Sequence, residues 1–286
     1  MFSRSLELVS VNMALDHGDP EERWRLFETA CLELPRRPDI IAIQEVAWEP
    51  GAMALNSLRL QLGSDYKLEL GHVYEGQEDQ KGAAVLTRVP IKTSQTVALK
   101  GTKKHAQVVG FGGEGASNLV LANLHLEASP KDELRRAYKL AELVDYLEAG
   151  YGLTPQAIAG DFNALPWFPS VRMMRLLGFK SAFEAVHGSE ASHTYPTPLS
   201  AEEMLTGNFS MPHQFRSLRT AARILSAVGV IGEHQRSASG LTRYPVDFVF
   251  TKGTVAPLDA GLIHDDTNGR RPFSDHYGIR TTLQLA

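Results

Sequence analysis

The chain has 286 residues, of which 43% are hydrophobic, and its formal net charge is −4. This length and apolar content suffice for a large buried core. The negative charge argues against a protein that coats nucleic acid through non-specific phosphate contacts, although a local basic groove stays compatible with it. The single cysteine, Cys31, cannot form an intrachain disulfide, so we expect an inert, buried thiol.

The chain carries no sign of a membrane span or a secretory signal. No stretch approaches the ~18 apolar residues of a transmembrane helix. Residues 1–10 also lack the continuous apolar region of a signal peptide. We therefore expect a cytoplasmic protein.

The first half of the chain predicts a strand, a helix, a strand and then a β-rich region. Largely apolar runs at residues 6–11 and 40–43 predict the two strands, and apolar residues at helical spacing predict a helix over residues 20–34. Further short apolar runs, bounded by Gly, Pro or Asn, predict neighbouring strands of an antiparallel meander. These runs are residues 82–86, 96–99, 107–111 and 119–124.

The middle of the chain predicts an amphipathic helix over residues 131–147, with Ser129-Pro130 as its start. The next predicted elements are a strand over residues 157–159 and a short helix over residues 171–177. The predicted apolar stripe of the long helix consists of Leu134, Ala137, Tyr138, Ala141, Val144 and Leu147.

Residues 196–244 break this alternation with mixed polar, Pro and Gly content around one helical stretch, residues 215–228, so we expect an insertion. Strands return at residues 246–251 and 279–285. No repeat or low-complexity linker is present, which favours a single domain over residues 1–286. The element order predicts an α+β fold, a four-layer α/β/β/α sandwich of two packed mixed, largely antiparallel sheets with helices outside.

Polar clusters follow or interrupt several of the apolar runs. Asp161 and Asn163 occupy alternate positions just after a predicted strand, so both side chains are expected on one face. Ser274-Asp275-His276 combines a carboxylate with an imidazole. Carboxylate, amide and imidazole groups gathered at one edge of a sandwich indicate a hard metal ion beside a phosphate.

Six polar motifs occur in a fixed order along the chain: Asn12, Gln44-Glu45, Asn123-Leu124-His125, Gly160-Asp161-Phe162-Asn163, Asp247 and Ser274-Asp275-His276. In this order and spacing the chain resembles the endonuclease/exonuclease/phosphatase superfamily across essentially its whole length. The superfamily includes deoxyribonuclease I, apurinic endonucleases, neutral sphingomyelinases, inositol polyphosphate 5-phosphatases and tyrosyl-DNA phosphodiesterase 2. One motif alone would be weak support, but six in order are hard to obtain by chance.

The resemblance implies a metal site made by Glu45, Asn12 and Asp275. Glu45 is similar to the main metal-binding carboxylate of the family, Asn12 completes the site from the adjacent strand, and Asp275 lies near the metal. The implied ion is Mg²⁺, with Mn²⁺ as a substitute. Without the resemblance, Glu45 would read as a solvated glutamate and Asn12 as a turn former.

The resemblance also implies a catalytic set. Asp161 corresponds to the residue that orients and deprotonates the attacking water, and Asn163 to its partner in holding the phosphate. His276 resembles the phosphate-facing histidine, which Asp247 orients and keeps cationic. His125 corresponds to a residue that contacts the phosphate or helps to protonate the leaving oxygen. The alternative for Asp161 is a helix cap.

Two departures distinguish the chain from some branches of the superfamily. Apurinic endonucleases tend to have tyrosine near the position of His125. They and tyrosyl-DNA phosphodiesterase 2 usually carry aspartate where this chain has Ala14, and Asp16 could replace that carboxylate only if the loop bends differently. These differences point away from the apurinic endonucleases.

The implied reaction is in-line attack of water on a phosphate ester, with no covalent enzyme intermediate. Nucleic acid is narrowly favoured as the substrate over a phospholipid head group, as in sphingomyelinases, or a small organophosphate. A non-catalytic binding protein on the same fold is a remote alternative. Arg216, Arg219 and Arg243 could clamp a second phosphate, although the solvated face of a helix is an equally simple explanation for arginines there.

Overall fold

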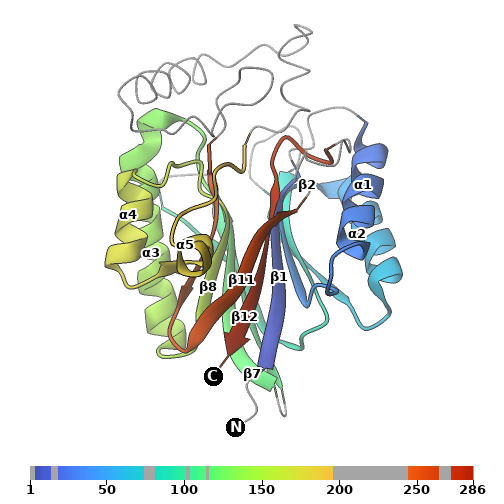
Figure 1. The fold of residues 1–286 in the computed structure, drawn as a ribbon, viewed down its shortest axis with the longest axis horizontal. Coiled ribbons are helices and arrows are strands. Elements are labelled where there is room, and N and C mark those ends of the chain that lie inside the picture. The colour runs from blue at the N-terminus through green and yellow to red at the C-terminus, as the bar shows by residue number, and fades with distance from the viewer. Residues whose placement is uncertain are drawn as a thin grey trace, which may run out of the picture.

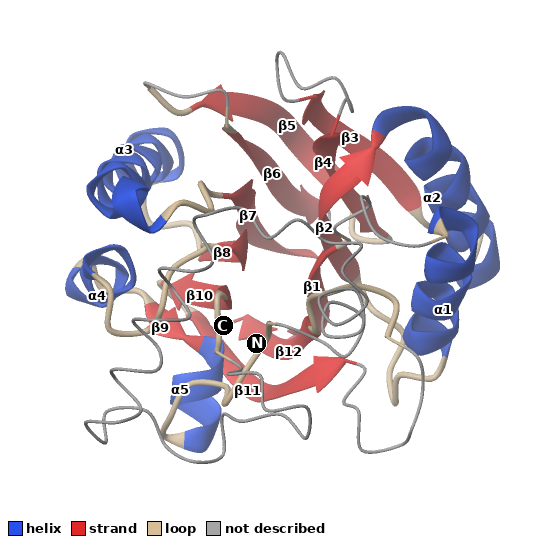
Figure 2. Ribbon diagram, turned by 90° about the horizontal axis from the view of Figure 1, so that it is seen from above, coloured by secondary structure: helices blue, strands red, loops and turns tan. Residues whose placement is uncertain are grey.

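A computed structural model describes residues 4–13, 19–73, 81–100, 104–113, 116–195, 244–263 and 272–285. Two six-stranded sheets pack face to face, and helices lie on the outer faces of both (Figure 1; Figure 2). The predicted four-layer sandwich is therefore confirmed. In the described part of the chain, no helix is long and apolar enough to cross a membrane.

The first sheet has the strand order β11-β12-β1-β2-β4-β3, and β1 and β2 form its parallel pair. The second sheet has the order β5-β6-β7-β8-β10-β9, and β7 and β8 form its parallel pair. The strands of the first sheet are β1 (Arg4–Asn12), β2 (Ile40–Ala47), β3 (Lys67–Val73), β4 (Lys81–Thr87), β11 (Val255–Ile263) and β12 (Gly278–Leu285). Those of the second are β5 (Ile91–Ala98), β6 (His105–Gly113), β7 (Ala116–His125), β8 (Gln156–Asp161), β9 (Lys180–Ser181) and β10 (Asp247–Lys252).

Helices cover each sheet because each strand surface carries an apolar face that must be removed from water. Helices α1 (Pro20–Leu32) and α2 (Trp48–Leu62) cover the first sheet, while α3 (Glu133–Tyr151) and α4 (Pro169–Leu176) cover the second (Figure 2). A 3₁₀ turn, η1 (Pro130–Asp132), precedes α3, and α5 (Ala182–His187) packs near β11. A third apolar layer lies between the sheets, where Leu8, Ile40 and Leu121 are fully buried.

Most predicted elements are present, but one strand belongs to the other sheet. The run at residues 82–86 is β4, which pairs with β2 and β3 and not with the meander β5-β6-β7. Helices α2 and α5 and strands β3, β9 and β11 were not predicted. Cys31 is buried as expected. The expected insertion at residues 196–244, including the helix at 215–228, lies outside the described residues except for Tyr244.

The predicted apolar stripe of α3 is confirmed at Val144 and Leu147, which are buried, and is wrong at Leu134 and Tyr138. Leu134 and Tyr138 are 79% and 59% exposed, whereas Arg136 and Lys139 are fully buried. Arg136 donates to the backbone oxygens of Glu127 and Ser129, and Lys139 pairs with the Glu127 carboxylate. These bonds satisfy the buried cations, and their long aliphatic stems fill the space that apolar side chains were expected to fill.

The strand directions bring the polar motifs to one edge of the sandwich. Strands β1, β2, β7 and β8 run toward this edge, and β10 and β12 run away from it because they are antiparallel to β8 and β1. Cross-strand pairs therefore place Asn12 opposite Gln44, His125 opposite Asp161, and Asp161 opposite Asp247.

Candidate active site

Asp161 is the last residue of β8 and lies where the two sheets meet at the polar edge. Gly160 before it has φ +140°, and a Cβ there would overlap the carbonyl oxygen of Leu124, so only glycine lets β8 approach β7 this closely. The Leu126 N–H then donates to the Asp161 carbonyl over 2.9 Å. The next described helix, α4, has Phe168 as its N-cap, which excludes a helix-capping role for Asp161.

Asn163 contacts Asp161 through both its backbone and its side chain. Its N–H lies 2.7 Å from Asp161 Oδ1, and its Nδ2 lies 3.0 Å from Asp161 Oδ2 and 3.0 Å from the Leu126 carbonyl oxygen. Strand alternation does not explain this contact, because Asn163 has φ 48°, in the left-handed region that asparagine tolerates. The structure thus brings the pair together by a turn.

Asn12 and Glu45 reach the same carboxylate from the first sheet. Asn12 Nδ2 lies 3.1 Å from Asp161 Oδ2 and 3.3 Å from Glu45 Oε1. Glu45 has φ 54°, and the β2–β4 register shifts between Ile43 and Val46. In the described residues, Glu45 and Asn163 are the two non-glycine residues with positive φ. Such conformations cost about 1–3 kcal/mol each and cluster at functional sites.

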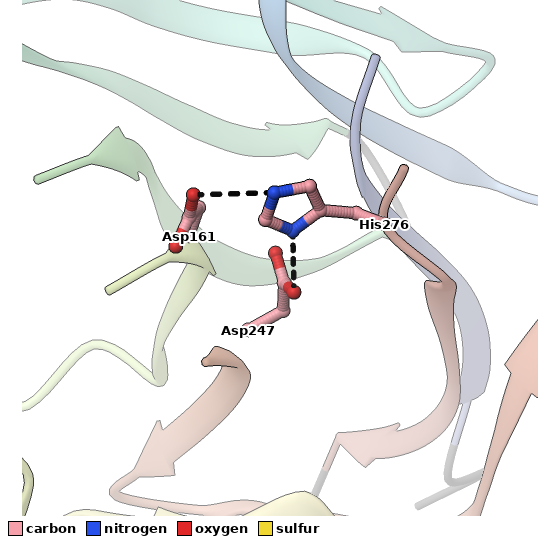
Figure 3. A group of neighbouring side chains, drawn as sticks. All are labelled: Asp161, Asp247 and His276. Carbon is pink, nitrogen blue, oxygen red and sulfur yellow. Dashed lines mark hydrogen bonds and ion pairs between the residues drawn. The ribbon is translucent and has the colours of Figure 1, made fainter. Parts of the chain in front are cut away.

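His276 and Asp247 form a hydrogen-bonded pair beside Asp161 (Figure 3). His276 Nδ1 lies 2.9 Å from Asp247 Oδ2, and His276 Nε2 lies 3.9 Å from Asp161 Oδ2. Burial lowers the pKa of His276, but Asp247, Asp275 and Asp161 outweigh burial and hold this pKa well above the ordinary value. The imidazole is therefore cationic at neutral pH.

The same cluster makes Asp161 an unusually weak acid for a carboxyl group. Burial, followed by the charge of Asp247, raises the pKa of Asp161 to about 7, while His276 and the hydrogen bonds from Asn163 and Asn12 act in the opposite direction. A carboxylate with a pKa near neutrality can accept a proton from water more readily than an ordinary aspartate.

His125 lies between the carboxylates and Lys104, a residue that no motif indicated. Its Nε2 is 3.5 Å from Glu45 Oε1 and 3.6 Å from Asp161 Oδ2, and its Nδ1 is 3.2 Å from Lys104 Nζ. A lysine ammonium has donors and no acceptor, so Nδ1 accepts from Lys104. The ring proton then resides on Nε2, toward the two carboxylates, which makes His125 a hydrogen-bond donor into the site.

For any reaction catalysed at this site, Lys104→Met should lower kcat about tenfold. The substitution removes a hydrogen bond from a charged donor to His125 and keeps the aliphatic length of the side chain. Lys104→Arg retains a donor and should stay near wild type. Nitrogen NMR of the His125 ring checks the cause directly. We expect one tautomer in the wild type and a tautomer mixture in the Met variant, and identical ring nitrogen shifts in both would contradict the arrangement.

Arg23, which no motif indicated, and Ser274, the first residue of the Ser274-Asp275-His276 motif, hold the segments around the metal-ligand candidates. Buried Arg23, from α1, donates to the carbonyl oxygens of Met13 and Phe273. Ser274 Oγ donates to the Asn12 carbonyl oxygen over 2.6 Å and lies 3.3 Å from Asp275 Oδ1. The segments that carry Asn12 and Asp275 are thereby joined, although Arg23 lies 250 residues from Phe273.

Gln44 and Asn123, which belong to two of the motifs, connect the sheets beneath the site. Gln44 Nε2 donates to Asn123 Oδ1 over 2.7 Å, and Asn123 Nδ2 donates to the carbonyl oxygens of Ile43 and Ala84. Both side chains are fully buried. Gln44 and Asn123 therefore attach one sheet to the other. This attachment fixes the neighbouring residues Glu45 and His125 relative to each other.

The acidic and imidazole groups offer two arrangements for a cation. Asp161, Asp247 and His276 have ligand atoms within 4.8 Å of one another (Figure 3). Both nitrogens of His276 face carboxylates, however, so this trio is better described as a hydrogen-bonded Asp247–His276 pair with an ion pair from His276 to Asp161. Glu45 and Asn12 lie beside Asp161 and supply hard oxygen atoms, and the Glu45 and Asp161 carboxylates both lie close to Asn12. These residues fit a divalent cation.

The structure thus brings together all eight predicted catalytic and metal-binding residues: Asn12, Glu45, His125, Asp161, Asn163, Asp247, Asp275 and His276. The three predicted substrate-binding residues, Arg216, Arg219 and Arg243, lie outside the described residues.

The chain is similar to known proteins in sequence pattern and in fold. Residues 9–276 match the model of the Endonuclease/Exonuclease/phosphatase family. An endonuclease/exonuclease/phosphatase from Bacteroides vulgatus is 15% identical with a TM-score of 0.69, and the alignment covers 99% of this chain and 100% of that one. Truncated TDP2 from Caenorhabditis elegans is 17% identical with a TM-score of 0.65, covering 99% and 98% of the two chains.

The human Nocturnin catalytic domain, with a bound sulfate anion, is 16% identical with a TM-score of 0.69, and 99% and 95% of the two chains are covered. At these identities the likeness to solved structures shows the fold alone. The comparison with curated protein sequences found no match.

Proposed function

Because the chain belongs to the endonuclease/exonuclease/phosphatase family, a family of phosphoric ester hydrolases, we propose that it is a Mg²⁺-dependent phosphodiesterase. In this proposal water attacks the phosphorus in line as the opposite P–O ester bond breaks, and the released oxygen takes its proton from solvent water. Nucleic acid is the favoured substrate. The supporting observation is the position of Asp161, whose carboxylate accepts from Asn12 and Asn163 while cationic His276 lies 3.9 Å away. The proposed base, Asp161, and the positive charge of His276 thus lie next to each other at this edge of the sandwich.

In the proposed reaction Asp161 accepts a proton from the attacking water, and Asn12 and Asn163 hold its carboxylate in place. His276 donates a hydrogen bond from Nε2 to a phosphoryl oxygen, where negative charge grows in the transition state. Asp247 holds the other nitrogen of that ring. His125 donates from Nε2 to the phosphate, which favours phosphate contact over protonation of the leaving oxygen.

Glu45, with Asn12 and Asp275, would hold the divalent cation at this edge. A bound Mg²⁺ would neutralise charge on the phosphoryl oxygens and would lower the pKa of an associated water. The proposed substrate-binding arginines and a cytoplasmic location stay predictions. A phospholipid head group is the second candidate substrate, and a binding protein without turnover is the third function.

Hydrolysis by the purified protein of a substrate panel tests the function. The panel contains single- and double-stranded DNA, RNA, bis-p-nitrophenyl phosphate, sphingomyelin vesicles and inositol phosphates, each with Mg²⁺, Mn²⁺ or EDTA. We expect cleavage of nucleic acid and of bis-p-nitrophenyl phosphate with either metal, and none with EDTA. Activity that survives EDTA would contradict the metal assignment.

The dependence on salt distinguishes the substrate classes. Nucleic-acid cleavage should fall steeply as salt rises, since binding releases counterions from the phosphates. Hydrolysis of a lipid head group should depend on vesicle presentation and change little with salt. Silence of the whole panel, with metal bound to the folded protein, would instead support the binding function.

A further inference from the structure

We propose that Thr194, a buried residue outside the predicted catalytic set, is a positioning residue that fixes Asp247 and His276 relative to each other. The inference rests on the proposed roles of Asp247 and His276. Thr194 follows α5 in the chain and comes from neither of the strands that flank the pair.

Thr194 is bonded to the backbone on both sides of the pair. Its Oγ1 accepts from the N–H of Val246 over 2.9 Å and from the N–H of Asp247 over 3.0 Å. Its carbonyl oxygen accepts from the N–H of Tyr277, the residue after His276, over 2.8 Å. Its own N–H donates to the Tyr244 carbonyl oxygen over 3.1 Å. Thr194 is fully buried, so water does not compete for these hydrogen bonds.

The position of these bonds matters because the pair spans the two sheets. Asp247 begins β10 in the second sheet, and His276 precedes β12 in the first. Packed sheets are held by side-chain contacts, which tolerate small shifts better than the hydrogen bonds within a sheet do. Thr194 adds hydrogen bonds from one residue to the backbone next to Asp247 and to the backbone next to His276. This connection sets the 2.9 Å distance between His276 Nδ1 and Asp247 Oδ2.

The neighbours of Thr194 support the same arrangement. The Tyr195 ring lies 4.8 Å from the His276 ring, and the His193 ring packs edge-on against Tyr277 at 4.9 Å. Segment 193–195 thus contacts the His276 imidazole through a side chain and the adjoining backbone through Thr194. A shift of this segment would change the direction of the ring as well as its distance from Asp247.

Thr194→Val tests the role because valine has the same shape and no hydroxyl acceptor. With bis-p-nitrophenyl phosphate and Mg²⁺, we expect kcat to fall by on the order of 10²-fold, as for small displacements of catalytic groups, with KM near wild type. Thr194→Ser keeps the acceptor and should retain kcat within about threefold. A purely structural threonine would lower the thermal midpoint of the Val variant and leave kcat per folded molecule unchanged.

Proton NMR of the free protein supplies a readout that does not depend on turnover. The proton between His276 Nδ1 and Asp247 should give a low-field signal in the wild type and the Ser variant, and a shifted or missing signal in the Val variant. His276→Ala identifies the signal by its loss. An unchanged signal and unchanged kcat in folded Thr194→Val would overturn the proposal.

If Thr194→Val does not fold, Thr194→Cys takes its place, because a thiol is a weak acceptor of similar size. For Thr194→Cys we expect a shifted proton signal and a fall in kcat that is smaller than the roughly 10²-fold predicted for valine. Wild-type values for both kcat and the proton signal would overturn the inference. His276→Ala separates failure of the proposed catalytic site from failure of the role of Thr194. If that variant keeps full activity, the proposed site is wrong. If it is inactive while the Val variant equals wild type, only the role of Thr194 fails.

Discussion

Asp161→Asn should lower kcat by at least about 10³-fold while the protein remains folded. The substitution keeps the size of the side chain and removes the proton acceptor, whose contribution as a general base is typically about 10²–10⁴-fold. The measurement is hydrolysis of bis-p-nitrophenyl phosphate with Mg²⁺. Asp145→Asn makes the same chemical change at an exposed position of α3 and should leave kcat unchanged. Ordinary hydrolysis by Asp161→Asn would remove Asp161 from the mechanism.

The stability of the same variant relative to the wild type should increase as the pH rises toward and above neutrality. A carboxyl whose pKa is raised to about 7 on folding stabilises the folded state at low pH, and this contribution is lost as the pH rises through 7. Asparagine does not ionise. Without added metal, the thermal midpoint of Asp161→Asn relative to the wild type should therefore be higher at pH 8 than at pH 5. A relative midpoint that does not rise between pH 5 and pH 8 would show that the Asp161 charge is not a destabilising group.

His276→Ala should lower kcat by about 10²–10³-fold with little change in KM. The physical reason is the loss of a cationic donor that stabilises charge appearing on the phosphoryl group in the transition state. Steady-state kinetics on the same substrate separate kcat from KM. His187→Ala removes an imidazole from α5, where His187 Nε2 contacts the Ala260 carbonyl oxygen, and serves as the control. An increase in KM alone would show that His276 binds substrate without taking part in the chemical step.

Asp161→Asn and His276→Ala remove opposite charges from one cluster of side chains. Asp161 contributes negative charge that burial makes costly, and His276 contributes positive charge that nearby carboxylates maintain. Removing either group also changes the field that acts on the other, so their effects on kcat should not be additive. The double variant is expected to lose little more activity than Asp161→Asn alone.

The residue types and their order were sufficient to predict the fold class and, through the family resemblance, to select eight residues that the structure brings together. The apolar runs of β1, β2, β7 and β8 were visible as periodic segments, and each ends or turns at a polar motif. This works because a strand end places its last side chains at a sheet edge, whatever the rest of the fold does. The adjacency of Asp275 and His276 also needed no tertiary information.

Local pattern failed where partners come from another part of the chain. The helical period placed a helix over the residues of α3, but burial of Arg136 and Lys139 depends on bonds with the loop at residues 127–129. The run that became β4 resembles its neighbours in sequence, and only pairing with β2 and β3 assigns it to the first sheet. Strand pairing between segments cannot be deduced from the period of one segment.

By itself, then, the sequence determined the chemistry of the site: which carboxylates, amides and imidazoles are present and which strands carry them. Tertiary structure alone decided how those groups are held. Lys104 contacts His125 across 21 residues, Thr194 contacts Asp247 across 53, and Arg23 contacts Phe273 across 250. Bonds at such separations depend on how two sheets and their helices pack, because that packing sets the positions of the backbone atoms involved.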